Sequence, residues 1–514
     1  MSGVSSGTAT LRAVHTIRAS WWSGDVAILV YLATATVIVH VLTGGQYGFH
    51  RDELATLEDA RHLAWGYVAY PPVTPFFGRL SLVLFGTSLA GFRFFAAVAE
   101  ALAVVLTGLM ARELGGTRRA QLVAATAAIP FCLVGGALMQ YVSFDYLGWV
   151  LTAYFTLRLL KSDDPRWWVA IGSSIGFGML SKYSMPFLVA GLFVGVLAAD
   201  VRRHLKSKWL WYGVALSLLI FLPNLIWQAQ HNFISIDFLQ QIHARDVRQG
   251  RADGFLPGQL KLTLLAAPLW IAGLYFYLFS PQGKRYRTLA WLYLVPLLIF
   301  LVAKGRDYYL AAAYPMLYAS GSVLLERQLQ SLRPPWAAIL RGLMWTALVV
   351  DIAIMAALTL ALAPVNSAWF NIANEVNSDF REEIGWPELV ATAAHIRDSL
   401  PAEDRAHLGI LATNYGEAGA VNLYGPQYGL PRAISGVNSF WEKGYGDPPP
   451  EVVIVLGMSR ESVQKKFAAC QLSAQSWNRF RVQNEETLQH PDIFVCRGLL
   501  QSWPEFWKNF RHFG

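Results

Sequence analysis

The chain has 514 residues, of which 54% are hydrophobic and only 15% are charged, whereas roughly 25% are charged in an average soluble domain. A mean hydropathy of +0.35 and repeated apolar stretches of about 18 to 25 residues exclude a disordered chain and predict a membrane protein that crosses the bilayer many times. The formal net charge is +8, but the sequence has no basic patch with interleaved aromatic residues, so no nucleic-acid partner is expected.

Apolar segments recur through residues 1–363 and predict an α-helical domain with about eleven transmembrane helices. Basic residues concentrate in the loops that share a side with the N-terminus, so the positive-inside rule places the N-terminus in the cytoplasm. The first segment is expected to remain as an uncleaved anchor, because it lacks a small-residue cleavage site. The predicted segments lie near 25–43, 89–111, 120–139, 146–160, 167–180, 183–199, 209–228, 258–280, 288–303, 308–325 and 336–363.

The chain changes character at Pro364, and residues 364–514 are expected to form a soluble mixed α/β domain. Because the number of spans is odd, this domain is expected to be extracytoplasmic. Its predicted strands and helices alternate and are separated by loops rich in Gly and Pro. The strand-like runs are 407–413, 451–456 and 492–496, and the helix-like runs are 386–399 and 461–469.

The three cysteines fall into two groups. Cys132 lies in a predicted span and is expected to pack as a small apolar side chain. Cys470 and Cys496 both lie in the predicted outer domain, where an oxidising compartment would allow them to pair if the geometry permits. The sequence leaves this disulfide open.

The loop at 44–88 follows the first predicted span and is expected to carry surface helices. Apolar residues recur at helical spacing through 51–65, which indicates an amphipathic helix lying along the membrane surface. Asp52 and Glu53 begin this helix. They can cap its free N–H groups and offset its dipole, or one of them can face a cavity and accept a proton from an acceptor hydroxyl as general base.

A second acidic residue, Asp145, enters the outer end of a span that is otherwise free of charge. An ionisable group at membrane depth is costly and suggests a function, so Asp145 can line the same cavity. It can equally be the structural partner of an arginine, and Arg93 in the second span is one candidate.

Three cations lie at the outer ends of two spans, against the positive-inside trend, and each group has tyrosines beside it. They are Lys182 next to Tyr183, and Lys304 and Arg306 next to Tyr308. Lys and Arg side chains at such positions can simply reach toward the headgroups. The alternative is that they bind an anion at the membrane surface, such as a lipid phosphate, and the repeated pattern favours this interpretation.

These positions together predict one outer cavity with a carboxylate on one side and phosphate-binding cations on the other, which is the equipment for moving a group from a lipid phosphate to a hydroxyl or an amine. Arg51 and Asp145 are expected to line this cavity, while Trp65, Tyr67 and Tyr70 are expected to offer aromatic surfaces to a sugar. No nucleotide or zinc motif is present in the sequence.

Two other classes of protein compete with this prediction. A transporter or flippase of a lipid-linked sugar would need ionisable residues near the bilayer midplane and paired broken helices, whereas the outward charges of this sequence lie at span ends. A structural or sensor protein would leave the adjacent carboxylates and the cationic span ends unexplained.

Several motifs resemble bacterial glycosyltransferase family 39, which includes dolichyl-phosphate-mannose protein mannosyltransferases, lipid A aminoarabinose transferases and rhizobial galacturonosyltransferases. The resemblance covers about residues 25–363. The motifs that carry it are Tyr47-Gly-Phe-His-Arg-Asp-Glu-Leu, Arg61-His-Leu-Ala-Trp-Gly-Tyr-Val, Tyr70-Pro-Pro-Val-Thr-Pro, Ala111-Arg-Glu-Leu-Gly-Gly, Ser181-Lys-Tyr and Lys304-Gly-Arg-Asp-Tyr-Tyr-Leu followed by Tyr314-Pro.

The resemblance implies a membrane fold of the GT-C type in the cytoplasmic (inner) membrane, a polyprenyl-phosphate-sugar donor and transfer with inversion. It implies that Asp52 acts as base with Glu53 as its neighbour, and that Lys182, Lys304 and Arg306 lie near the donor phosphate. The acceptor is expected to be a protein, lipid A or another glycan, and whether a divalent cation takes part stays open. The motif continues Asp-Glu-Leu-Ala, without the His or Arg found a few positions later in the characterised branches, so the sugar and the acceptor are not assigned.

Overall fold

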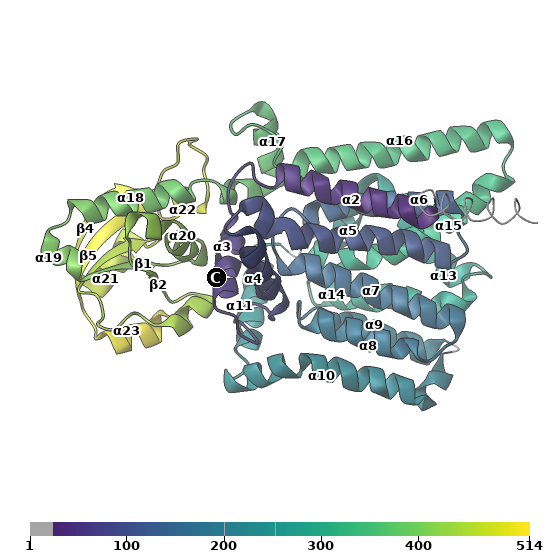
Figure 1. Cartoon of the computed structure of the whole chain (residues 1–514), viewed down its shortest axis with the longest axis horizontal. Helices are drawn as coiled ribbons and strands as arrows, with labels where there is room; N and C mark the ends of the chain where they lie inside the picture. Colours follow the sequence, from purple (N-terminus) through teal and green to yellow (C-terminus); the bar gives the residue numbers. More distant parts are fainter. Residues whose placement is uncertain (1–23, 200, 252) are drawn as a thin grey trace, which may run out of the picture.

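The structure is a computed structural model that describes residues 24–199, 201–251 and 253–514. Long helices form one half of the molecule and a small α/β domain forms the other (Figure 1). A helix occurs at each predicted span. These helices are α2 (Asp25–Thr43), α5 (Leu89–Glu113), α6 (Arg118–Gly135), α7 (Tyr141–Ser162), α8 (Trp167–Met179), α9 (Met185–Ala198), α10 (Lys208–Gln230), α13 (Ala267–Phe279), α14 (Arg287–Val302), α15 (Tyr314–Ser331) and α16 (Pro334–Thr359).

Within the described residues, six stretches are long and apolar enough to cross a membrane: Asp25–Thr43, Leu89–Glu113, Lys208–Gln230, Phe255–Phe279, Lys284–Val302 and Pro334–Thr359. The segment predicted at 258–280 is interrupted. It consists of α12 (Phe255–Thr263), a 3-10 turn and α13, which begins with Pro268 in its first turn. Proline lacks the N–H that would continue the preceding helix, which accounts for the break.

The first loop contains two helices, α3 (Arg51–Arg61) and α4 (Val73–Phe85), which lie between the helical bundle and the C-terminal domain (Figure 1). The expectation of an amphipathic helix on the membrane surface is met only in part. Besides Leu54 and Leu57, the polar side chains of Glu58 and Asp59 are also buried. The C-terminal domain covers the face of α3 that was expected to meet water, because α20 (Tyr415–Tyr424) packs directly on it.

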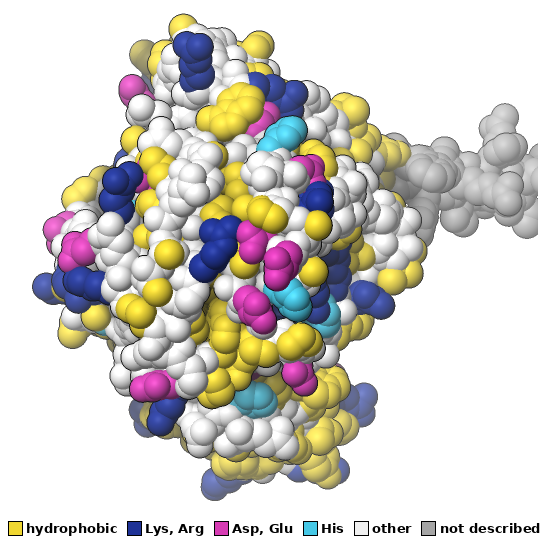
Figure 2. Space-filling view, turned by 90° about the vertical axis from the view of Figure 1, so that its left-hand side faces the viewer, with side chains coloured by type: hydrophobic (Ala, Val, Ile, Leu, Met, Phe, Trp, Pro, Cys, Tyr) yellow, Lys and Arg dark blue, Asp and Glu magenta, His cyan; other side chains and the backbone are white. Residues whose placement is uncertain are grey.

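The C-terminal domain is built on a five-stranded sheet in the order β2-β1-β3-β5-β4. β2 (Ala433–Ser435), β1 (Leu408–Ala412) and β3 (Val452–Leu456) are parallel, while β5 (Asp492–Leu499) and β4 (Phe467–Gln475) are antiparallel to their neighbours. β1, β3 and β5 occupy the three predicted strands, and α18 (Trp386–Ser399) occupies the first predicted helix. Figure 2 shows acidic, basic and hydrophobic side chains interspersed over the face of this domain.

The helix predicted at 461–469 is wrong over its last three residues. α21 (Arg460–Lys466) ends early, and the chain continues as β4. Most residues of β4 are exposed, because it is the edge strand of the sheet and only β5 pairs with it. Such a strand lacks the alternation of apolar and polar residues that identifies a half-buried strand in a sequence.

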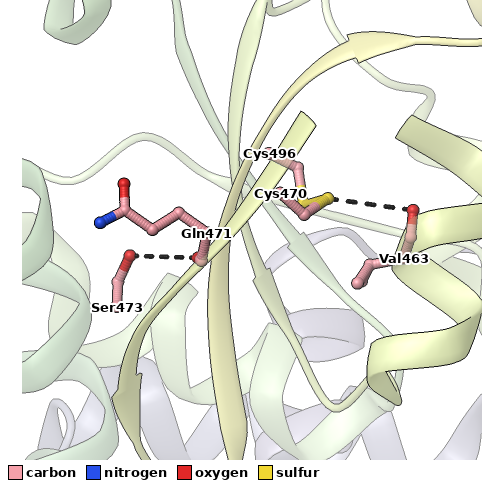
Figure 3. The surroundings of a disulfide bond; sticks show 5 residues. All are labelled: Val463, Cys470, Gln471, Ser473 and Cys496. Atoms are coloured by element: carbon pink, nitrogen blue, oxygen red, sulfur yellow. Dashed lines mark hydrogen bonds between the residues drawn. A yellow bond between two sulfur atoms is a disulfide. The ribbon is translucent and has the colours of Figure 1, made fainter. Parts of the chain in front are cut away.

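Cys470 of β4 and Cys496 of β5 form a disulfide, with their Cα atoms 4.1 Å apart (Figure 3). The two residues are direct partners in the antiparallel ladder. The disulfide therefore fixes the edge strand to the centre of the sheet. Cys132 is a buried free thiol in α6.

One hydrophobic cluster joins the two halves of the molecule. It contains Leu57 of α3, Phe92 of α5, Phe144 of α7, Trp386 of α18 and Val452 of β3. Burial of large side chains from both halves in one cluster provides an apolar driving force for docking, at about 25 cal/mol per Å² of apolar surface removed from water. The C-terminal domain therefore docks on the helical half through a packed hydrophobic contact with α3, α5 and α7.

Candidate active site

Asp52 lies in the first turn of α3, where the C-terminal domain meets the helical bundle. Its Oδ1 accepts a hydrogen bond from the Tyr415 hydroxyl at 2.9 Å, and its Oδ2 accepts one from Gln140 Nε2 at 3.1 Å. The side chain is 42% exposed, so the carboxylate keeps access to a substrate. His50 caps the helix by accepting from the backbone N–H of Asp52 through Nδ1.

Glu53 is fully buried and its carboxylate is saturated with donors. Oε2 accepts from Arg93 Nη2 at 2.6 Å and from the backbone N–H of His50 at 2.9 Å. Oε1 accepts from Arg93 Nε at 2.9 Å and from the N–H of Met139 at 2.8 Å. Arg93 also bonds Glu383 at 3.0 Å. This arrangement favours the capping explanation for Glu53, which leaves Asp52 as the carboxylate able to act as base.

Arg51 points toward the C-terminal domain, away from the span ends. Its Nη1 forms a short ion pair with Glu485 and lies 3.9 Å from Glu382, and its guanidinium lies 5.0 Å from the centre of the Tyr415 ring. Arg51 therefore contributes to domain docking beside Asp52.

The cation side of the site is built around tyrosines at the start of α7 and in the 3-10 helix that follows α14. Lys182 Nζ lies 4.5 Å from the centre of the Tyr309 ring, 5.6 Å from that of Tyr308 and 5.3 Å from that of Tyr141. The faces of several aromatic rings stabilise a cation without neutralising its charge. The Lys182 ammonium can therefore still bind an anion.

Arg306 is held by a two-pronged ion pair with Asp246 of α11 (Ile234–Arg248), with Nε–Oδ2 and Nη2–Oδ1 distances of 2.7 and 2.8 Å. Its Nη1 donates to the Tyr308 hydroxyl at 3.3 Å. Lys304 is exposed in the turn between α14 and the 3-10 helix η4 (Asp307–Ala313). The two cations of this segment therefore differ, because Asp246 fixes the orientation of Arg306 whereas Lys304 is exposed.

Tyr141 and Tyr308 connect the acid side to the cation side. Tyr141 directly follows Gln140, which donates to Asp52, and the Tyr308 hydroxyl accepts from Arg306. Since Lys182 faces the rings of the same two tyrosines, the structure brings Asp52, Lys182 and Arg306 into one neighbourhood.

The remaining predicted site residues lie around this neighbourhood. Asp145 accepts from the Ser184 hydroxyl at 2.6 Å and lies within electrostatic range of Lys182, so it is not the partner of Arg93. Tyr183 donates to Asn224 Oδ1 at 3.3 Å and accepts from Gln228 Nε2 at 2.7 Å.

The aromatic residues of the first loop occupy different environments. Tyr70 is buried, donates to Asp59 Oδ2 at 2.7 Å, and packs with its ring centre 5.9 Å from that of Tyr141. The hydroxyl of Tyr67 donates to backbone carbonyls of the same loop. Trp65 is 61% exposed, and its carbonyl accepts from Asn224 Nδ2 at 2.8 Å. Of these three aromatic residues, Trp65 is the one that presents an open ring.

Sequence reasoning missed four residues of this neighbourhood: Gln140, Tyr141, Asp246 and Tyr415. Gln140 and Tyr141 lie a few residues before Asp145 in the sequence. Two polar residues at that point could have indicated that they belong to the same site. Asp246 and Tyr415 come from distant segments that no local pattern connects to the site. No cluster of three or more His, Cys, Asp or Glu side chains suited to a metal occurs in the part of the chain that the structure describes.

The comparisons with known proteins agree with the motifs. Residues 69–227 match the family described as dolichyl-phosphate-mannose-protein mannosyltransferase. This match confirms the resemblance to glycosyltransferase family 39. The matched segment runs from the first loop through α10 and includes Lys182.

Two curated relatives are similar to parts of the chain. Undecaprenyl phosphate-alpha-4-amino-4-deoxy-L-arabinose arabinosyl transferase 1 of Pseudomonas fluorescens is 29% identical over 264 residues, which are 48% of this chain and 47% of the relative. Lipopolysaccharide core galacturonosyltransferase RgtB of Rhizobium johnstonii is 25% identical over 193 residues, or 35% of this chain and 37% of the relative. The chain thus spans about half the length of the curated relatives it matches, or less.

The fold is shared over nearly the whole chain. The crystal structure of ArnT from Cupriavidus metallidurans bound to undecaprenyl phosphate superposes with a TM-score of 0.58 at 15% identity, covering 91% of this chain and 97% of that chain. Its apo state superposes with the same TM-score. The chain is therefore a polytopic membrane protein with an ArnT-like fold and a small C-terminal sheet domain.

Proposed function

We propose that the protein is an inverting glycosyltransferase that moves a sugar from a polyprenyl-phosphate donor to an acceptor outside the cytoplasm. The observation that carries this proposal is the convergence of Asp52, Lys182 and Arg306 around Tyr141 and Tyr308. When a sugar leaves a phosphate, positive charge develops at the reacting centre and negative charge develops on the phosphate. A carboxylate and two cations in one neighbourhood can stabilise these two opposite charges.

In the proposed reaction, Asp52 accepts the proton of the acceptor nucleophile as it attacks the anomeric carbon. The bond from that carbon to the phosphate oxygen breaks on the opposite face, which inverts the anomeric centre, and the bonding electrons stay with the polyprenyl phosphate. Lys182 and Arg306 stabilise the negative charge on this leaving group, and Lys304 in its exposed turn adds a mobile positive charge.

The similar proteins support a lipid-phosphate donor, because one relative is named for an undecaprenyl-phosphate sugar and the ArnT crystal structure is bound to undecaprenyl phosphate. We extend this donor class to the present chain, with a protein, lipid A or another glycan as acceptor. The curated relatives named above are transferases, which favours transfer over transport of the lipid-linked sugar.

We also propose that the chain lies in the inner membrane with its N-terminus in the cytoplasm. The excess of basic residues in the loops on the side of the N-terminus supports this orientation. The C-terminal domain, and with it the catalytic neighbourhood, is then extracytoplasmic. A disulfide in that domain is consistent with an oxidising compartment.

The test compares the wild type with Asp52→Asn and with Asp237→Asn, which changes an exposed carboxylate of α11 outside the site. Mass spectrometry of envelope glycolipids and glycoproteins from cells with and without the chain identifies the sugar and the acceptor. Transfer by purified protein is then measured with the matching donor. Asp52→Asn should lower kcat by about 10²- to 10⁴-fold, which is typical for loss of a general base, while Asp237→Asn stays at the wild-type rate. Full activity of Asp52→Asn would remove Asp52 from the mechanism.

A further inference from the structure

The carboxylate of Asp52 receives one hydrogen-bond donor from each half of the molecule. Gln140 donates to Oδ2 from the start of α7, and Tyr415 donates to Oδ1 from the C-terminal domain. A donor on each oxygen restricts rotation of the carboxylate about its last side-chain bond. The other lone pairs of the Asp52 carboxylate therefore keep a fixed direction.

Local structure explains why Tyr415 stands in this position. Asn414 caps α20 by accepting from the N–H of Glu417 at 2.8 Å, and Glu417 accepts in return from the N–H of Asn414 at 3.2 Å. This reciprocal cap makes Tyr415 the first residue of α20 and fixes its backbone. Gly419, one turn later, lies so close to α3 that an added Cβ would stand 2.7 Å from the Cβ of Leu54.

The environment of Tyr415 makes its hydroxyl a donor. Burial, and next the charge of Asp52, raise the pKa of Tyr415 well above its ordinary value, so the hydroxyl keeps its proton at physiological pH. The Arg51 guanidinium lies over the ring, and the ring packs against the buried cluster that includes Ala418 and Phe440, which holds the hydroxyl toward the carboxylate.

We infer that Tyr415 is a positioning residue for the proposed transfer reaction, which holds the Asp52 carboxylate in the orientation that accepts the proton of the acceptor. This inference rests on the proposed function and gives the C-terminal domain a defined part in it. The domain completes the active site by supplying one of the two donors to the base, and an undocked domain would leave Asp52 free to rotate.

Tyr415→Phe tests the inference because it removes the hydroxyl and keeps the ring over Arg51. Tyr428→Phe, at an exposed tyrosine elsewhere in the same domain, is the matched control. Loss of a hydrogen bond to a charged group is worth about tenfold in rate, so Tyr415→Phe should lower kcat about tenfold and leave the donor KM within about twofold. Wild-type kcat in Tyr415→Phe, even if Tyr415→Ala is impaired, would assign Tyr415 to packing alone and overturn the inference.

A second measurement does not depend on turnover. The Tm of the purified full chain is recorded for the wild type, Asp52→Ala, Tyr415→Phe and the double variant, which together form a double-mutant cycle. If the hydroxyl and the carboxylate interact, the double variant should lose clearly less than the sum of the two single losses. Additive losses would overturn the inference. If the wild type transfers no polyprenyl-phosphate sugar, the proposed function fails. The cycle then still decides whether the Tyr415 hydroxyl holds the Asp52 carboxylate.

Discussion

Lys443 of the C-terminal domain donates to the carboxylate of Glu58 in α3 across the interface between the two halves of the molecule, at 2.7 Å. Arg432 forms a short ion pair with the same oxygen. Glu58 is almost completely buried, and burial alone would raise its pKa. Lys443, Arg432 and His62 together outweigh this effect, so the pKa of Glu58 lies below its ordinary value of 4.5. The pair therefore favours docking above that pH and loses this contribution as the pH falls.

Lys443→Met should weaken the docking of the C-terminal domain on α3. The substitution leaves a buried carboxylate with Arg432 as its remaining strong partner, so the free energy of unfolding should fall by about 2 kcal/mol at pH 7. Hydrogen exchange is expected to rise in α3 and α20, which pack against each other. Thermal unfolding and mass-spectrometric hydrogen exchange measure the two effects.

The double variant Glu58→Gln/Lys443→Met is the matched control. Removing the charge of Glu58 removes most of the penalty of leaving it unpaired, so the double variant should be more stable than Lys443→Met alone. A double variant that is less stable than the single one would contradict this view of the interface.

Substitutions in the ion pair between Arg306 and Asp246 should weaken binding of the donor. Asp246 holds Nε and Nη2 of Arg306, which fixes the plane of the guanidinium beside Tyr308. Arg306→Lys cannot reproduce this two-pronged geometry and should raise the donor KM roughly tenfold, with a smaller change in kcat. Asp246→Asn should raise the donor KM about threefold by loosening Arg306. Steady-state kinetics over a range of donor concentrations separates KM from kcat.

Asp237→Asn, on the same helix as Asp246, controls for a general effect on α11. An unchanged donor KM in both Arg306→Lys and Asp246→Asn would mean that Arg306 does not face the donor phosphate.

The sequence predicted where the helices lie, because hydropathy over about 20 residues is a local property, and six stretches of the described residues are long and apolar enough to cross a membrane. It could not distinguish Asp52 from Glu53. Adjacent residues on a helix point about 100° apart, so one of the two faces the core and the other faces the opening. Which one faces the core depends on Arg93, 40 residues away, and that contact exists only in the fold. The contact of Tyr415 with Asp52 spans 363 residues, and no periodicity or motif in the sequence reports it.

Loss of the Cys470–Cys496 disulfide should destabilise the C-terminal domain. The cysteines are 26 residues apart, and closing a loop of that length destabilises the unfolded chain by about 3.5 kcal/mol. Cys470→Ser/Cys496→Ser, or the wild type with a reductant, should therefore have a lower Tm than the oxidised wild type. Cys132→Ser should respond to the reductant as the wild type does, because Cys132 is a free thiol in α6. An oxidised and a reduced wild type with the same Tm would contradict a stabilising disulfide.

The stability of the C-terminal domain should also depend on pH through Glu486. This residue is buried and lines a cavity of about 80 Å³ with Glu417, and its Oε2 has no hydrogen-bond partner among the described residues. Burial raises the pKa of Glu486 to about 7, although the Arg51 guanidinium opposes the shift, while the charges of Glu417 and Glu382 add to it. Between the ordinary value of 4.5 and about 7, the folded state binds a proton that the unfolded state has lost, so stability falls as the pH rises through this window.

Glu486→Gln removes this titration and should therefore raise the Tm at pH 8 relative to the wild type, with little change at pH 5. Its Tm should also vary less between these two pH values. Glu461→Gln is the matched control, since Glu461 is exposed on α21 and forms an ion pair with Lys465 across one helical turn. Differential scanning fluorimetry across the pH range measures each Tm. A Glu486→Gln protein that is less stable than the wild type at pH 8 would show that the charged carboxylate stabilises the fold, with Arg51 as the dominant partner.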